Sequence, residues 1–98
     1  MSDRHELDLS TDLRIDTNGD VHKLEGPKNG EDYTLDELQS MVEGYIEMLP
    51  GCPFSGEHIG IANEEGLLLG FEYNQKASEL FGMELVGPVA IIRRERMK

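Results

Sequence analysis

The stretch TLDELQSMVEGYIEML, residues 34–49, predicts the principal helix of the fold. Thr34 followed by Glu37 forms a capping box, and Asp36 adds a favourable negative charge to the first turn. Pro50 and Gly51 then end the helix. Between these signals, apolar residues recur at three- and four-residue spacing and form one continuous stripe. They are Leu35, Leu38, Met41, Val42, Tyr45, Ile46 and Leu49.

Before this helix, the sequence DLRIDTNGDVHKLE at residues 12–25 predicts a β-hairpin. Its Asn-Gly pair favours a tight turn, because both central positions of a type I′ turn need a positive φ. The apolar residues of the hairpin would be Leu13, Ile15, Val21 and Leu24. Residues 1–11 are polar and acidic without a pattern, so we expect them to form a flexible arm.

After the helix, residues 50–57 form a loop rich in proline and glycine, and two strand-like segments follow it. HIGIAN and LLLGFEY flank EEG, which predicts a second hairpin with Gly66 in the left-handed region. A helix of about two turns is then capped by Asn74 and ends at Gly82. LVGPVAIIRR is the last strand, and Pro88 indicates a bulge or a sheet edge there.

These elements predict an α+β fold with two layers. We expect an antiparallel or mixed sheet of about five strands, made of two hairpins and a C-terminal strand. One long and one short helix would pack on one face of this sheet. The whole would be a single domain over residues 12–98, preceded by the arm of residues 1–11.

The composition excludes several partners and compartments. The chain has 98 residues, with 20 acidic against nine basic residues and a formal charge of −11. Such a surface repels nucleic acid and anionic membranes, although the acidity could equally serve only solubility. Neither a membrane span of roughly 18 apolar residues nor the apolar core of a signal peptide is present, so we expect a location in the host cell cytoplasm. The lone Cys52 fits a reducing compartment.

Metal sites and catalytic groups are weakly indicated. The run DTNGD at residues 16–20 begins like a calcium loop, but Val21 and Pro27 occupy the positions that need glycine and glutamate. Cys52 and His58 match no zinc spacing, and no strained nucleophile turn supports them as a catalytic dyad. We therefore expect no metal, no cofactor and no enzymatic activity.

The segment NQKAS at residues 74–78 could hold an anion. The first N–H groups of a helix are unpaired, Lys76 adds a positive charge, and Ser78 adds a hydroxyl group. The alternative is that Asn74 only caps the helix. The other basic cluster, Arg93, Arg94 and Arg96, would by default pair with the protein's own carboxylates.

Four of these stretches together resemble a known family. TLDELQSMVEGYIEML, IANEEGLLLGFEYN, NQKAS and LVGPVAII span residues 34–92 in this order. In order and spacing they resemble a small family of phage and mobile-element proteins, the domain-of-unknown-function family three-eight-four-six. The arm before residue 12 and the loop PGCPFSGEH depart from the family pattern. The resemblance implies an accessory protein that counters host defences.

The leading hypothesis is a non-enzymatic binding protein that sequesters a small nucleotide-like immune signal. A domain this small is shallow, so we expect the pocket to lie between subunits of a homo-oligomer. Tyr45 would stack on the base, Glu47 and Asn63 would bind polar edges or ribose hydroxyls, and the second helix start would bind a phosphate. The candidate residues are Tyr45, Glu47, Asn63, Asn74, Lys76 and Ser78.

The competing hypothesis is an acidic decoy. Its carboxylates would imitate the phosphates of DNA and occupy a host defence protein that binds nucleic acid. A mimic needs its acids in a regular stripe, whereas here they are scattered over arm, turns and helix. An enzyme ranks third, because the paired acids Glu64 and Glu65 lie in a turn where solvation is their default role.

Overall fold

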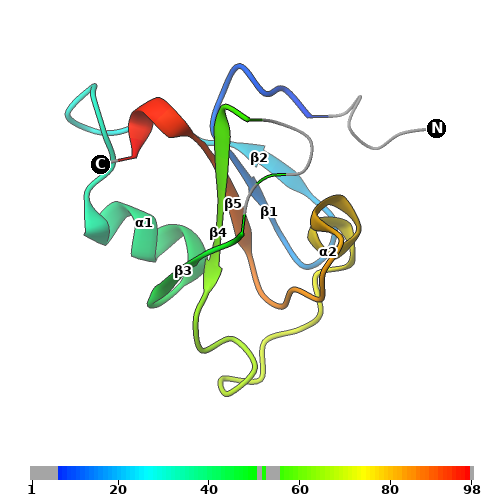
Figure 1. Cartoon of the computed structure of the whole chain (residues 1–98). Coiled ribbons are helices and arrows are strands. Elements are labelled where there is room, and N and C mark those ends of the chain that lie inside the picture. Colours follow the sequence, from blue (N-terminus) through cyan, green and yellow to red (C-terminus); the bar gives the residue numbers. More distant parts are fainter. Residues whose placement is uncertain (1–6, 51, 53–55, 98) are drawn as a thin grey trace.

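A five-stranded antiparallel sheet with two α-helices makes up the fold (Figure 1). The computed structural model describes residues 7–50, 52 and 56–97. The strand order is β2-β1-β5-β4-β3, so the predicted α+β class and the number of about five strands are confirmed, although one of the strands lies elsewhere in the sequence than predicted. The elements are β1 (Leu13–Ile15), β2 (Val21–Lys23), α1 (Leu35–Val42), β3 (Ile46–Met48), β4 (His58–Asn63), α2 (Gln75–Phe81), β5 (Val89–Arg93) and the 3₁₀ helix η2 (Arg94–Arg96).

The central strand β5 is buried on both of its faces. Val89 and Ile91 belong to the cluster that contains Ala77 and Phe81 of α2. Ala90 and Ile92 belong to a second cluster, which contains residues of α1, namely Leu38, Met41 and Val42. The two helices therefore cover opposite faces of the sheet, as Figure 1 shows, and the prediction of two layers with both helices on one face was wrong. A continuous apolar run, such as residues 89–92 of β5, is typical of such double burial.

The first hairpin is confirmed, with a different turn. β1 pairs with β2 around a three-residue loop, in which the N–H of Gly19 donates to the carbonyl of Asp16 at 3.0 Å. Gly19 has φ +91°, whereas Asn18 stays at negative φ. The loop is thus a type I turn followed by a left-handed glycine, and not the two-residue type I′ turn that the Asn-Gly pair favours.

The principal helix begins as predicted but is shorter. Thr34 and Glu37 form both bonds of the capping box. α1 ends at Val42, because Glu43 takes a left-handed φ of +63° and Gly44 a φ of +155°. A Cβ at Gly44 would lie 2.6 Å from Asn63 Nδ2, so only glycine fits there. The chain then continues as β3, which corrects the prediction of a helix up to Leu49.

The second predicted hairpin does not form. β4 pairs with β3 and β5, and residues 64–70 make a loop of turns. The N–H of Leu69 donates to the carbonyl of Glu65 at 2.9 Å, and the N–H of Phe71 to that of Gly66 at 3.0 Å. These i to i+4 and i to i+5 bonds coil the segment and leave Leu67, Leu68 and Leu69 largely exposed.

The sheet edges are β2 and β3. Pro88 precedes the first residue of the central strand β5, so the edge alternative of the prediction for Pro88 was wrong. A proline directly before a strand removes no ladder hydrogen bond.

Residues 7–11 lie against the domain, although they were expected to belong to a flexible arm. Leu7 is buried in the cluster on the α2 side, and His58 Nε2 donates to the carbonyl of Leu9 at 2.8 Å. Residues 1–6, the rest of that predicted arm, and residues 51 and 53–55 of the predicted loop lie outside the described residues. Within the described ranges, no helix is long and apolar enough to cross a membrane.

Candidate functional site

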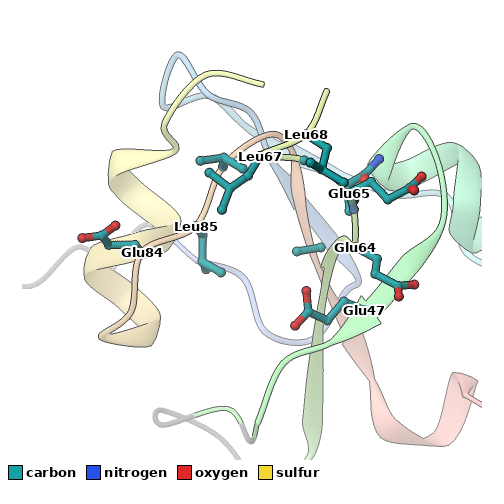
Figure 2. A pocket seen from close by; sticks show the side chains of 11 residues that line it. Glu47, Glu64, Glu65, Leu67, Leu68, Glu84 and Leu85 are labelled. Atoms are coloured by element: carbon teal, nitrogen blue, oxygen red, sulfur yellow. Dashed lines mark hydrogen bonds between the residues drawn. The ribbon is translucent and has the colours of Figure 1, made fainter. Parts of the chain in front are cut away.

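A pocket of about 370 Å³ opens where β3 and β4 meet the loop at residues 64–68. Its other wall is the segment at residues 84–86, which follows α2. The lining combines acidic and apolar side chains, seen from close by in Figure 2. The lining residues are Glu47, Ala62, Asn63, Glu64, Glu65, Gly66, Leu67, Leu68, Glu84, Leu85 and Val86.

The strand pairing places Glu47 at this pocket. Glu47 on β3 lies opposite Ala62 on β4, and the two side chains share the sheet face that α2 covers. Figure 2 shows the Glu47 carboxylate extending toward the cavity, whereas the carboxylates of Glu65 and Glu84 point outward. Glu47 is therefore the acid that a bound group would meet inside the pocket.

Leucines form the apolar part of the pocket. Leu67 and Leu68 are 83% and 86% exposed, the highest values among the exposed large hydrophobic side chains of the described residues. Leu85 is buried at the opposite wall. Adjacent exposed leucines form an apolar patch beside the cavity, and such patches are often interaction sites.

Asn63 holds the pocket loop in place. Its Nδ2 donates to the carbonyl of Val42 at 3.0 Å, and its Oδ1 accepts from the N–H of Glu65 at 2.7 Å. The amide thus joins the end of α1 to the loop that carries the leucines. Asn63 lines the pocket as predicted for a binding residue, but its buried side chain already has partners on both ends.

The pocket is strongly negative. Among the described residues that line it there are four glutamates and no lysine, arginine or histidine. Among the residues that the structure describes, none of these four carboxylates takes part in an ion pair. Unneutralised carboxylates beside apolar walls attract cations and repel anions. The site therefore suits a positively charged group with an apolar stem.

The predicted anion site at the start of α2 is occupied by the protein's own hydrogen bonds. Asn74 is fully buried, and its Nδ2 donates to the carbonyls of Ile15 at 3.0 Å and Gly87 at 2.8 Å. Its Oδ1 accepts from the N–H of Ala77 at 3.0 Å, so the alternative role as a helix cap is confirmed. All the hydrogen-bonding capacity of this amide nitrogen is used to join α2 to β1 and to the segment before β5.

Ser78 is engaged in the same way. Its Oγ donates to the carbonyl of Leu85 at 3.2 Å and accepts from the N–H of Leu85 at 2.8 Å. This pair of bonds closes the turn after α2 and positions Leu85 at the pocket wall. Ser78 thus shapes the acidic pocket from behind and does not face it.

The remaining predicted residues lie in two places. Tyr45 is 62% exposed and adjoins the pocket, since its carbonyl accepts from the N–H of Glu64 at 2.8 Å. Lys76 lines a separate cavity of about 240 Å³ beside the first hairpin loop. The structure therefore brings Tyr45, Glu47 and Asn63 together but separates them from Lys76.

The arginines near the C-terminus, Arg93, Arg94 and Arg96, form hydrogen bonds within the fold. Asp12 is buried, and its Oδ1 accepts from the backbone N of Arg93 at 2.9 Å and from Arg93 Nε at 3.1 Å. Its Oδ2 accepts from the Tyr33 hydroxyl at 2.6 Å. Burial raises the pKa of Asp12, but the hydrogen bonds from Arg93 and Tyr33 outweigh it and lower the pKa below its ordinary value. Burial and the bond to Asp12 raise the pKa of Tyr33.

No cluster of three or more metal-ligating side chains occurs within the described part of the chain. In the run that resembles a calcium loop, Asp16 instead accepts from Arg14 Nε at 2.9 Å and lies 2.6 Å from His22 Nε2. Sequence reasoning missed Leu67, Leu68 and Glu84 as pocket residues. The only hint was the run of three leucines in an acidic neighbourhood, which was interpreted as a strand.

A comparison with protein families gives one match. A family model described as Domain of unknown function (DUF3846) matches residues 13–97, which include every strand and helix described above. Neither the curated proteins nor the solved structures give a match to the chain.

Proposed function

The chain belongs to the DUF3846 family, a domain family of unknown function, and we propose that it is a non-enzymatic binding protein for a basic partner protein. The acidic pocket at the β3–β4 end would hold a lysine or arginine side chain of that partner. Such a side chain combines a cationic head with an aliphatic stem.

One observation supports this proposal above all. The Glu47 carboxylate extends toward a cavity lined in part by leucines, and every charged residue among the described lining residues is acidic. The stem of the guest side chain would contact Leu67, Leu68 and Leu85, and its head would meet Glu47. The volume of about 370 Å³ lies at the lower end of ordinary ligand pockets and suits one long side chain.

The same features argue against a nucleotide in this pocket. A phosphate would approach four carboxylates without a cation among the lining residues. Asn74 and Ser78, which were expected to help bind the phosphate, are buried and hydrogen-bonded within the fold. Sequestration of a nucleotide signal therefore stays a prediction that the experiment below also tests.

The biological role that we propose keeps the partner of the decoy hypothesis, a host protein that binds nucleic acid, but replaces imitation of DNA by capture of one basic side chain. Proteins that bind nucleic acid carry exposed lysine and arginine, and such a protein would be a natural partner. Acids gathered around an apolar pocket would capture one basic side chain, without imitating the whole DNA backbone. An accessory role for a phage or mobile element, acting against host defence, rests on the sequence resemblance alone.

Titration with small probes tests the proposal. Backbone amide NMR signals of the protein would be followed with N-acetyl-arginine amide, with the uncharged N-acetyl-norleucine amide, and with ADP-ribose and cyclic nucleotides. We expect the arginine probe to shift signals of residues 62–68 and 84–86 and the norleucine probe to shift them less. Glu47→Gln should lower the affinity for the arginine probe about two- to fivefold, because it removes one partly exposed ion pair.

Glu31→Gln is the matched control, because it removes the same charge from an exposed turn that does not line the pocket. An equal loss of affinity in both variants would mean that only net charge matters, and the pocket would not be the site. Binding of a nucleotide, with no response to the arginine probe, would overturn the proposal and restore nucleotide sequestration.

A homo-oligomer also stays a proposal. The expectation rested on the small size of the domain, and the sheet edge that Pro88 was taken to indicate is absent, because Pro88 directly precedes the central strand β5. Light scattering at micromolar concentration would decide, with a mass above the 11.0 kDa of one chain as the supporting result.

A further inference from the structure

Within the described part of the chain, edge strand β3 leaves backbone groups without partners next to the acidic pocket. The N–H of Leu49 donates to the carbonyl of Gly60, and the N–H of Glu64 donates to the carbonyl of Tyr45. Hydrogen-bonded pairs alternate along an antiparallel ladder, so Glu47 bonds to Ala62 between them. The backbone N–H and C=O groups of Ile46 and Met48 therefore point away from the sheet.

We propose that the basic partner binds by adding an extended segment to β3, with a lysine or arginine directly opposite Glu47. This inference rests on the proposed function and specifies its geometry. The outward groups of Ile46 and Met48 would make up to four main-chain hydrogen bonds to the added strand. The basic side chain would then enter the pocket from the open side of β3.

The register predicts the partner's sequence pattern. In an antiparallel pair, directly opposite residues have Cβ atoms about 4.5–5.5 Å apart and share one face. The residue opposite Glu47 therefore lies on the pocket face. Its two neighbours lie on the other face beside Ile46 and Met48, which calls for apolar side chains there. The expected motif is apolar, basic, apolar, in an extended conformation.

A second copy of this chain fits the edge poorly. Two-fold pairing of β3 with itself around Glu47 would place this carboxylate opposite its own copy, and like charges directly opposite each other are destabilising. Each chain also carries a formal charge of −11. Charge complementarity thus selects a basic segment over self-association.

The other edge of the sheet lacks these features. On β2, Lys23 pairs with Asp8 at 3.1 Å, and His22 lies 2.6 Å from Asp16. A lysine on an edge strand is a common protection against strand addition. β3 carries no positive charge and exposes Met48 instead.

Peptide binding tests the inference. The probe is Ac-Thr-Val-Arg-Val-Thr-amide, compared with the same peptide carrying glutamate in place of arginine and with one N-methylated at both valines. NMR titration should shift the amide signals of Ile46 and Met48. Removing one hydrogen bond should weaken binding about two- to tenfold, so N-methylation of two residues should weaken it at least that much. The glutamate peptide should not bind.

Protein variants separate the edge from the pocket. Met48→Pro deletes an outward N–H and no bond to β4, and we expect about two- to tenfold weaker peptide binding. Glu47→Gln should weaken it about two- to fivefold, and Glu31→Gln should leave it nearly unchanged. If Met48→Pro fails to fold, the N-methylated peptide tests the same bonds on the unaltered protein.

The outcomes distinguish the two proposals. If Glu47→Gln lowers the affinity for the peptide while N-methylation of the peptide has no effect, the pocket binds a basic side chain but the proposal of strand addition is wrong. If N-methylation lowers the affinity of the peptide while Glu47→Gln has no effect on it, both the cation pocket and the proposed register are wrong. Sensitivity to both changes supports both proposals.

Discussion

The start of α2 and the acidic pocket are both rich in polar side chains, but they use them in opposite ways. At α2, Asn74 and Ser78 are buried, and every strong hydrogen-bonding group of Asn74 has a partner inside the fold. At the pocket, Glu47 and Glu84 are exposed and have no ion pair among the described residues. The sequence alone suggested Asn74, Ser78 and Glu47 as binding residues. The comparison of the two regions shows that only Glu47 still has a group available for a ligand.

The physical reason is the cost of burying polar groups. A buried amide stays in a fold only when its donors and acceptors are satisfied, which leaves none for a ligand. An exposed carboxylate is satisfied by water and can exchange that water for a cation. We therefore expect substitutions at α2 to change stability, and substitutions at the pocket to change binding.

Asn74→Asp should have the largest effect on stability. Aspartate caps helices well, but it cannot donate to the carbonyls of Ile15 and Gly87, and it would place a charge in a fully buried site. We expect a loss of about 3–5 kcal/mol in the free energy of unfolding. Urea unfolding measures it.

Gln75→Glu is the control for this variant, since it adds the same charge at the next, exposed position. It should change stability by less than about 0.5 kcal/mol. Equal stability of both variants would show that Asn74 acts only as a cap, and the contrast between the two regions would fail.

Asp12→Asn comes second, with an expected loss of about 2–3 kcal/mol at pH 7, because the bonds that Arg93 and Tyr33 make to a charged group are weakened. The folded pKa of Asp12 is lowered, so its contribution to stability is full above the unfolded value of about 3.9 and is lost as the pH falls through the folded pKa. The difference between variant and wild type should therefore shrink in acid.

Unfolding free energies at several pH values between about 2 and 7 measure this dependence. Tyr33→Phe removes one of the hydrogen bonds and should show a smaller loss with the same direction. A difference that stays constant down to the lowest pH would mean that the Asp12 charge does not stabilise the fold.

Ser78→Ala should cost about 1–2 kcal/mol, because it removes the two bonds to the backbone of Leu85. Ser40→Ala is the matched control, as its exposed hydroxyl donates only to the carbonyl of Asp36. Thermal melts of both variants compare them. Similar melting temperatures would indicate that the buried hydroxyl is not needed to hold the turn after α2.

The sequence predicted the features that depend on neighbouring residues. The capping box at Thr34, the cap at Asn74 and the hairpin around Gly19 each arise from local hydrogen bonds, and each is present. The end of α1 was missed because it depends on a distant residue. Asn63 bonds to Val42 and leaves room only for glycine at position 44.

The layers were mispredicted although the sequence contains the signal. Residues 89–92 are apolar at every position, which is typical of a strand covered on both faces. The pocket, in contrast, could not be predicted. The sequence analysis did select Glu47 and Asn63, but as residues that would bind a nucleotide. Leu67 and Leu68 join them only because coiled turns, and not a strand, follow β4.

Glu47→Gln should have the smallest effect on stability, at less than about 0.5 kcal/mol. We expect a slight rise in the free energy of unfolding, because the variant relieves repulsion within a pocket lined by four glutamates in a protein of charge −11. That gain should fade as salt screens the charges. Urea unfolding at low and high salt, beside Glu31→Gln, measures it. A loss above about 1 kcal/mol would place Glu47 among the structural residues such as Asn74, since surface substitutions rarely reach this size. If Glu47 is a binding residue, the variant should instead keep nearly the same free energy of unfolding and bind the arginine probe more weakly.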